Sequence, residues 1–296
     1  MAPLRRRRGL CHHGAMSGPA ELPVAVFDSG VGGLTVLHEL LVSLPNEDYV
    51  YLGDTARLPY GDRSAEELQA FSVQIAEHLL DLGAKLLVMA CNSASAAALP
   101  TVQAHLDRQG REIDVIGVLH PAAQLAVAAS HSGRIGLMAT PATVASGAYE
   151  RIVRFADPHV HLESVACPDL ASTIEAGFPF DEHLVATVRE YCAPLRRAEV
   201  DTVILGCTHF PLIAPMIQRM LGRGVTMVTS GPGVARSVER ALAARALLNP
   251  RTDEGSYGFS CTGDVTAFQA LGTRFLQMPL GEVVHVDLGA RVAAAR

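Results

Sequence analysis

The chain has 296 residues, which is enough to bury a large hydrophobic core, and its length favours two domains of ordinary size. About half of the residues are apolar (49%) and 18% are charged, as in a soluble α/β enzyme. The net charge of −6 gives no positive field for nucleic acid, and no apolar run reaches the ~18 residues that span a bilayer. We therefore expect a cytoplasmic protein that contacts neither a membrane nor nucleic acid directly.

Residues 1–21 form a segment of unusual composition. Four consecutive arginines, Arg5 to Arg8, are not followed by an apolar stretch, so the segment does not have the pattern of a secretion signal. Charge runs of this kind are usually solvated. We expect a disordered N-terminal extension.

Cysteine and lysine usage restricts the chemistry. The six cysteines have no CxxC or other short spacing, which argues against a disulfide framework and for a reducing compartment. The single lysine, Lys85, precedes an apolar strand at the end opposite to the expected ligand crevice. A pyridoxal phosphate enzyme needs a Schiff-base lysine in its site, and a P-loop needs a lysine after its glycines. We therefore expect a reaction that uses neither pyridoxal phosphate nor a nucleotide bound by a P-loop. We expect no other cofactor either.

Apolar periodicity predicts alternating strands and helices throughout the chain. The first half has expected strands at 24–27, 49–52, 86–90 and 115–119, and helices at 34–44, 65–82, 95–108 and 121–129, with Pro100 as a possible kink. The second half has expected strands at 135–139, 160–166, 202–206 and 225–228, and helices at 144–155, 169–176, 178–197 and 234–248. Strand-like segments at 256–261 and 283–286 return to the first sheet. A capping box at Ser64 opens the second helix.

A glycine-rich turn at 28–33 joins the first strand to the first helix. Backbone N–H groups at such a helix start bind carboxylates or phosphates. Thr35 stands where a dinucleotide fingerprint has its third glycine, which argues against a nucleotide cofactor.

Residues 86–93 and 202–209 look like imperfect copies of each other. Each is an apolar strand that ends in a cysteine, Cys91 or Cys207, followed by small hydrogen-bonding residues. Cys91 lies 62 residues after Ser29, and Cys207 lies 67 residues after Thr140. This near-equal spacing predicts two similar α/β domains, each a mostly parallel sheet flanked by helices. Domain 1 would comprise residues 22–114 and 229–296, and domain 2 residues 115–228.

Ligands of parallel sheets bind beyond the carboxyl ends of the strands, so both cysteines should face the cleft between the domains. Two thiols on opposite sides of one molecule can invert a carbon stereocentre, since one removes a proton and the other returns one. Asp28 could order one thiol and His209 the other. The expected donors around them are small and neutral and suit a zwitterion with carboxylates: Ser29, Asn92, Ser93, Thr140, Thr143 and Thr208.

Four segments, 27–34, 53–61, 90–95 and 205–211, resemble the motif set of the glutamate racemases, and the resemblance covers about 24–237. It implies cofactor-independent interconversion of L- and D-glutamate, which supplies D-glutamate for peptidoglycan. It further implies that Cys91 deprotonates the D-isomer with help from Asp28, and that Cys207 deprotonates the L-isomer with help from His209. Glu175 would lie near the substrate ammonium.

The same resemblance implies that the loop with Pro59, Tyr60 and Gly61 binds substrate. It also implies a homodimer, and an interaction with DNA gyrase in some relatives. The chain departs from the usual pattern at Ser93, where threonine is common, at 120–122, and at 229–231, which lacks an aspartate before the serine. The proposed catalytic groups are all retained.

Other interpretations stay open at this stage. The enzyme could be an aspartate racemase or another amino-acid racemase of the family. A zinc hydrolase would use Cys91, Cys207, His209 and Asp28 as metal ligands, and a binding protein would show no turnover. His209 could be a structural histidine, Asp28 a helix cap and Tyr60 a packing residue. Cys167, Cys192 and Cys261 are expected to be inert core residues.

Overall fold

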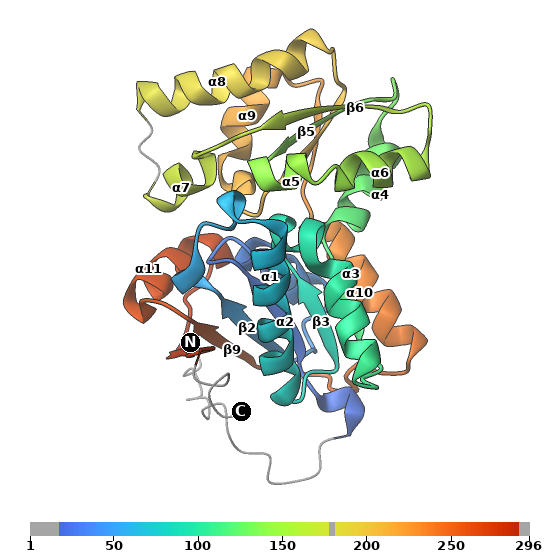
Figure 1. Cartoon of the computed structure of the whole chain (residues 1–296), viewed down its shortest axis with the longest axis vertical. Helices are drawn as coiled ribbons and strands as arrows, with labels where there is room; N and C mark the ends of the chain where they lie inside the picture. Colours follow the sequence, from blue (N-terminus) through green and yellow to red (C-terminus); the bar gives the residue numbers. More distant parts are fainter. Residues whose placement is uncertain (1–17, 178–180, 290–296) are drawn as a thin grey trace.

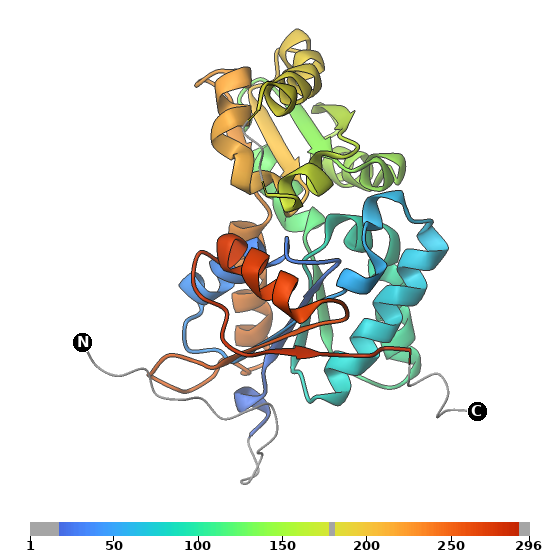
Figure 2. The same cartoon turned by 90° about the vertical axis from the view of Figure 1, so that its left-hand side faces the viewer.

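The computed structural model describes residues 18–177 and 181–289, and within them two parallel sheets lie in two lobes stacked along the long axis (Figures 1 and 2). The first sheet has the strand order β10-β9-β2-β1-β3-β4. Its strands are β1 (Val24–Asp28), β2 (Tyr49–Gly53), β3 (Leu86–Met89), β4 (Asp114–Gly117), β9 (Tyr257–Cys261) and β10 (Val283–His285). The predicted return of the C-terminal strands to this sheet is confirmed, since β9 pairs with β2.

The second sheet has the order β6-β5-β7-β8. Its strands are β5 (Arg134–Ala139), β6 (His161–Ala166), β7 (Thr202–Gly206) and β8 (Thr226–Val228). This order repeats β2-β1-β3-β4 of the first sheet, with every neighbouring pair parallel. The predicted duplication is therefore confirmed at the level of topology. In this repeat β3 corresponds to β7, and each is followed by one of the two cysteines.

Helices cover both sheets and account for the continuous apolar character of the strands. They are α1 (Leu34–Ser43), α2 (Ala65–Asp81), α3 (Asn92–Arg108), α4 (Leu119–Ala129), α5 (Pro141–Ala145), α6 (Ala148–Ala156), α7 (Leu170–Glu175), α8 (Glu182–Arg197), α9 (Ala214–Leu221), α10 (Gly231–Ala244) and α11 (Val265–Leu276). Short 3₁₀ helices are η1 (Pro19–Glu21), η2 (Thr55–Arg57), η3 (Tyr60–Asp62) and η4 (Phe210–Ile213). No helix in the described ranges is both long and apolar enough to cross a membrane.

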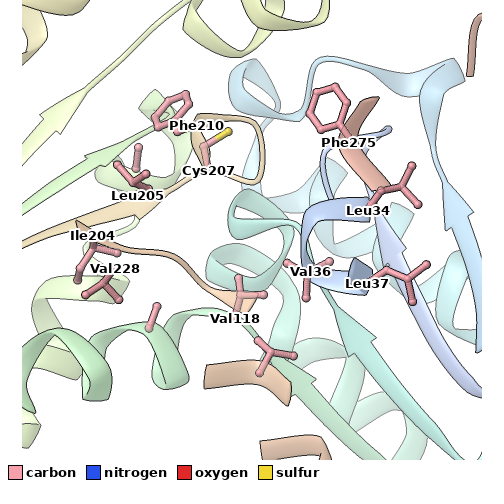
Figure 3. Close-up of a cluster of buried hydrophobic side chains, with 14 of the residues drawn as sticks. Leu34, Val36, Leu37, Val118, Ile204, Leu205, Cys207, Phe210, Val228 and Phe275 are labelled. Atoms are coloured by element: carbon pink, nitrogen blue, oxygen red, sulfur yellow. The ribbon is translucent and has the colours of Figure 1, made fainter. Parts of the chain in front are cut away.

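Alternation along β1 sorts the core of the first lobe into two clusters. Val24 and Val26 belong to the cluster that includes α1, α10 and α11, whereas Ala25 and Phe27 pack with α2 and α3. The first cluster continues into the second lobe. Figure 3 shows Leu34 and Phe275 on one side of the junction and Leu205 and Phe210 on the other, with Cys207 on the side of the second sheet that faces the junction.

Several predicted boundaries need correction. Residues 115–117 belong to β4, whose Val115 and Ile116 pair with β3 in the first sheet, and a helix rather than a strand contains Leu119. The expected helix 144–155 is interrupted at Gly147, whose φ of 61° lies in the left-handed region that glycine tolerates. Pro100 does not end α3.

The last residues of the predicted N-terminal extension are ordered. Residues 19–21 form η1, and the carbonyl of Ala20 accepts a hydrogen bond from Nζ of Lys85. The remainder of the predicted extension, 1–17, and residues 178–180 of an expected helix lie outside the described residues. Helices α9 and α11 were not predicted.

Candidate active site

A cavity between the two lobes encloses about 630 Å³ of empty space, part of it continuous with solvent. Its walls come from the loops after β1, β2, β3, β5, β6 and β7, which is where an open parallel sheet places its ligands. Most of the predicted site residues line it: Ser29, Pro59, Tyr60, Gly61, Cys91, Asn92, Ser93, Thr140, Glu175, Cys207, Thr208 and His209. The cavity therefore unites residues from both halves of the repeat.

The two thiols enter this cavity from opposite sheets. Cys91 follows β3 and is the N-cap residue of α3, and Cys207 follows β7 at the equivalent place of the second sheet. Both cysteines are buried, with 5% and 6% of their surface exposed. A small molecule in the cavity would have one sulfur from each lobe beside it.

On the first side, a short relay of polar groups joins Cys91 to Asp28. Sγ of Cys91 lies 3.8 Å from Oγ of Ser29, which lies 3.5 Å from Oδ1 of Asp28. Burial, followed by the negative charge of Asp28, raises the pKa of Cys91 to about 12. Cys91 is therefore a protonated thiol at neutral pH, ready to act as an acid.

Asp28 does not line the cavity; it lies fully buried behind the glycine-rich turn. Its Oδ1 accepts from the backbone N–H of Gly30, and its Oδ2 accepts from Thr208 of the opposite lobe at 3.3 Å. Burial raises the pKa of Asp28, while the charge of His209 acts in the opposite direction. Asp28 is thus connected to Cys91 through Ser29 rather than by direct contact.

On the second side, His209 stands next to Cys207. Its Nδ1 lies 3.7 Å from the sulfur, and its Nε2 lies 3.2 Å from Oε1 of Glu175, an ion-pair distance without hydrogen-bond geometry. Burial tends to lower the pKa of His209, but its contacts with Cys207 and Glu175 raise it to about 10. A protonated imidazole is the kind of neighbour that stabilises a thiolate. The two cysteines therefore have unequal electrostatic surroundings.

Three hydroxyl groups form a cluster that bridges the lobes. Oγ of Ser93 lies 2.9 Å from Oγ1 of Thr140 and 3.3 Å from Oγ1 of Thr143. Thr143 itself does not line the cavity, but its hydroxyl accepts from Thr140 and so supports that residue from behind. Serine at position 93 thus supplies a hydroxyl group to this cluster, as a threonine would.

The loop at 58–61 forms one wall, and it is held from below by Asp54. The Tyr60 hydroxyl donates a short hydrogen bond to Asp54, which also pairs with Nε of Arg57 at 2.6 Å. Thr262, at the end of β9, donates to the same carboxylate at 2.8 Å. The peptide bond between Leu58 and Pro59 is cis. Tyr60 is therefore both a packed residue and a lining residue.

The glycine-rich turn touches the opposite lobe so closely that it has no room for a side chain. A Cβ atom on Gly32 would lie 2.3 Å from Oγ1 of Thr208 and 2.6 Å from the ring of His209. Thr35, at the position of the third glycine of a dinucleotide fingerprint, instead donates to the carbonyl of Thr208 at 3.1 Å. The turn is built to contact the other lobe.

Sequence reasoning missed some of the lining. Asp62, Asp169 and Ser172 face the cavity, as does Cys167, which is fully buried and was expected to be inert core. Asp169 to Glu175 follow β6, so the rule that ligands lie beyond strand ends could have found them.

The zinc hydrolase alternative loses its geometric basis. In the described ranges, no three His, Cys, Asp or Glu side chains are placed to hold a metal ion, so the proposed zinc ligands do not form a site. Lys85 is buried at the start of β3, away from the cavity, where its Nζ pairs with Glu47 at 2.6 Å.

Comparison with known proteins agrees with this arrangement. Residues 35–238 match the model of the Asp/Glu/Hydantoin racemase family. A glutamate racemase of Bacillus cereus is 40% identical over 265 residues, which is 90% of this chain and 97% of the relative. The chain therefore belongs to this family of racemases.

Solved structures narrow the family to one group. The crystal structure of glutamate racemase isoform RacE1 from Bacillus anthracis matches with a TM-score of 0.86 at 37% identity, over 91% of this chain and 98% of that chain. Glutamate racemase from Francisella tularensis, in complex with D-glutamate, matches with a TM-score of 0.83 at 33% identity, over 92% and 99%. Within the family, the group that this chain matches is the glutamate racemases.

Proposed function

We propose that this protein interconverts L- and D-glutamate with two cysteine bases, Cys91 and Cys207, and thereby supplies D-glutamate for peptidoglycan. The observation that carries the proposal is the position of these thiols at equivalent strand ends of two sheets that share one four-strand order, on one common cavity. Fold, lining and family membership support the same reaction. Aspartate racemisation is the runner-up, because the lining alone does not define the length of the substrate.

In the L-to-D direction, the thiolate of Cys207 takes the α-proton of L-glutamate and becomes a thiol. Cys91, a thiol at neutral pH, gives its proton to the opposite face of the carbanion and becomes a thiolate. The C–H bond that breaks on one face is replaced by one on the other, so protons and charge balance. The D-to-L direction uses the two sulfur atoms in exchanged roles.

The remaining residues bind and orient the substrate. Glu175, 3.2 Å from His209, supplies a negative charge for the substrate ammonium. Asn92, Ser93, Thr140 and Thr208 supply neutral donors for its carboxylates, together with backbone N–H groups at the start of α3. Ser29 and the loop of Pro59, Tyr60 and Gly61 close the wall, and Thr143 supports Thr140.

We propose the division into two domains in the form predicted, with the first boundary moved to follow β4 at Gly117. The chain passes from the first sheet to the second after β4 and returns after β8. A homodimer and any interaction with DNA gyrase follow from the family resemblance alone, and a cytoplasmic location follows from composition and cysteine usage; all three stay predictions.

The decisive experiment follows isotope incorporation in D₂O. Two bases on opposite faces place solvent deuterium on Cα of the product before it appears in recovered substrate. Equal early labelling of product and substrate would show a single base. Cys91→Ser and Cys207→Ser should each lower kcat at least 10²-fold, because each removes one proton carrier; full activity in either variant would refute the scheme. Parallel assays with glutamate and aspartate decide the substrate.

A further inference from the structure

One buried side chain that the proposed mechanism does not use reaches across the junction to a cavity residue. Tyr149 lies on α6 of the second lobe with none of its surface exposed, and its hydroxyl donates to Oδ1 of Asn92 at 2.8 Å. Asn92 is the first residue of α3 in the first lobe and lines the cavity. The bond therefore joins the two lobes directly at the substrate cavity.

Of the two polar atoms of the Asn92 amide, only Oδ1 has a hydrogen-bond partner. Its side chain is buried, and Nδ2 has no hydrogen-bond partner among the described residues. A buried donor without a partner is unfavourable, so this group requires an acceptor when the cavity is filled. A carboxylate of the substrate is an acceptor of the right charge and size.

The phenol of Tyr149 is suited to hold this arrangement. Burial raises the pKa of Tyr149, and the nearby Ser230 hydroxyl acts weakly in the opposite direction, so the phenol keeps its proton at neutral pH. A protonated phenol that donates to Oδ1 opposes rotation of the amide by 180°. The other amide end, Nδ2, then remains the end that has no partner among the described residues.

We propose that Tyr149 is a positioning residue, which fixes the Asn92 amide so that Nδ2 serves as a hydrogen-bond donor to a carboxylate of the bound amino acid. The inference rests on the proposed function, because it takes glutamate as the ligand. It adds a residue from the second lobe to the recognition of a group held by the first. Substrate binding and lobe contact are then linked through one hydrogen bond.

A double-mutant cycle tests the proposal through steady-state kinetics in both directions. Tyr149→Phe keeps the ring and removes the donor. It should raise KM for both enantiomers about 3- to 10-fold, the value of one hydrogen bond, with kcat within about twofold. In an Asn92→Ala background, the same substitution should change KM less than about twofold. A purely structural role would give the same factor in both backgrounds and would overturn the proposal.

A second variant and two controls keep the test independent of folding. Asn92→Asp replaces the donor with a charged oxygen and should raise KM more than Asn92→Ala does; a KM near that of the wild type would overturn the assignment of Nδ2. Tyr257→Phe, whose hydroxyl donates to exposed Glu254, is the matched control and should leave KM unchanged. Urea unfolding of every variant shows whether it is folded under the assay conditions.

The outcomes also separate this inference from the function on which it rests. A wild-type protein that neither racemises nor binds glutamate overturns the proposed function, and the role of Tyr149 with it. Wild-type racemisation together with an additive cycle overturns only the role of Tyr149. Direct titration of each variant with D-glutamate provides Kd values that should follow the KM pattern.

Discussion

Substituting Gly32 with alanine tests whether contact between the two lobes sets the catalytic geometry. A Cβ atom at this position would lie 2.3 Å from Oγ1 of Thr208 and 2.6 Å from Nδ1 and Cε1 of His209. Ordinary van der Waals contact begins near ~3.5 Å, so the two lobes or these side chains must separate by about 1 Å. Thr208 and His209 both belong to the loop that carries Cys207, so this movement displaces one of the two bases.

The magnitude follows from that displacement. A misplacement of about 1 Å in a catalytic constellation costs roughly 10²-fold in rate, or about 2.7 kcal/mol of transition-state stabilisation. It also weakens the hydrogen bond from Thr208 to Asp28, now 3.3 Å long. Overpacking elsewhere costs about 1–3 kcal/mol of folding free energy, so the variant should remain folded.

The assay measures kcat/KM in both directions by a coupled or circular-dichroism method, with urea unfolding in parallel. We expect Gly32→Ala to lower kcat/KM about 10²-fold. Gly224→Ala is the matched control, since a Cβ atom there meets nothing within 4 Å, and it should retain full activity. A Gly32→Ala enzyme within threefold of the wild type would refute the argument that this contact sets the geometry.

Four further predictions concern the His209 charge, folding stability and metals. Because the pKa of His209 is raised to about 10, the imidazolium that faces Cys207 loses its proton only above that pH, and kcat should fall above pH 10. The His209→Asn variant should lack this decrease in its profile of kcat against pH. Because the pKa of His209 is higher in the folded protein than the ~6.5 of an unfolded chain, its protonated form stabilises the fold, and this stabilisation is complete below pH ~6.5. The stabilisation is lost as the pH rises through 10. Urea titrations at about pH 6 and about pH 10.5 would detect the loss. Lys85→Met should cost about 3–5 kcal/mol of folding free energy, because it leaves Glu47 buried without its ion-pair partner, and kcat should be unchanged. Arg134→Met, which breaks an exposed ion pair, should cost under about 1 kcal/mol. Equal costs in urea unfolding would contradict this account. Dialysis against a chelator should leave kcat unchanged, and a loss that zinc restores would favour the hydrolase alternative.

The buried strands and the repeat of the two halves could be predicted from the sequence, because apolar runs and residue spacing both indicate them. The two strands that end in Cys91 and Cys207 are continuous apolar runs, because both faces of a parallel strand are buried. Their near-equal spacing from Ser29 and Thr140 predicts the repeated strand order that the two sheets have. The capping box at Ser64 is also present, with reciprocal hydrogen bonds to Glu67.

What the sequence could not provide is the relation between the lobes. The bond from Tyr149 to Asn92 and the contact of Gly32 with His209 join residues far apart in the chain, and periodicity carries no information about such pairs. Cys167 shows a different limit, because a thiol can be buried in the core and still line a cavity. Pro100 stays inside α3, where packing against α2 outweighs the lost backbone bond.

The unequal surroundings of the two thiols have a consequence for the kinetics. L- and D-glutamate have the same free energy in water, so kcat/KM must be equal in the two directions at every pH. An L-isomer reacts with enzyme in which Cys207 has lost its proton and Cys91 has kept it, and a D-isomer needs the reverse. Burial and the Asp28 charge behind Cys91 raise the pKa of Cys91, and this favours the first form. The rarer second form must then have the larger intrinsic kcat/KM for its own isomer, through tighter binding, faster turnover or both.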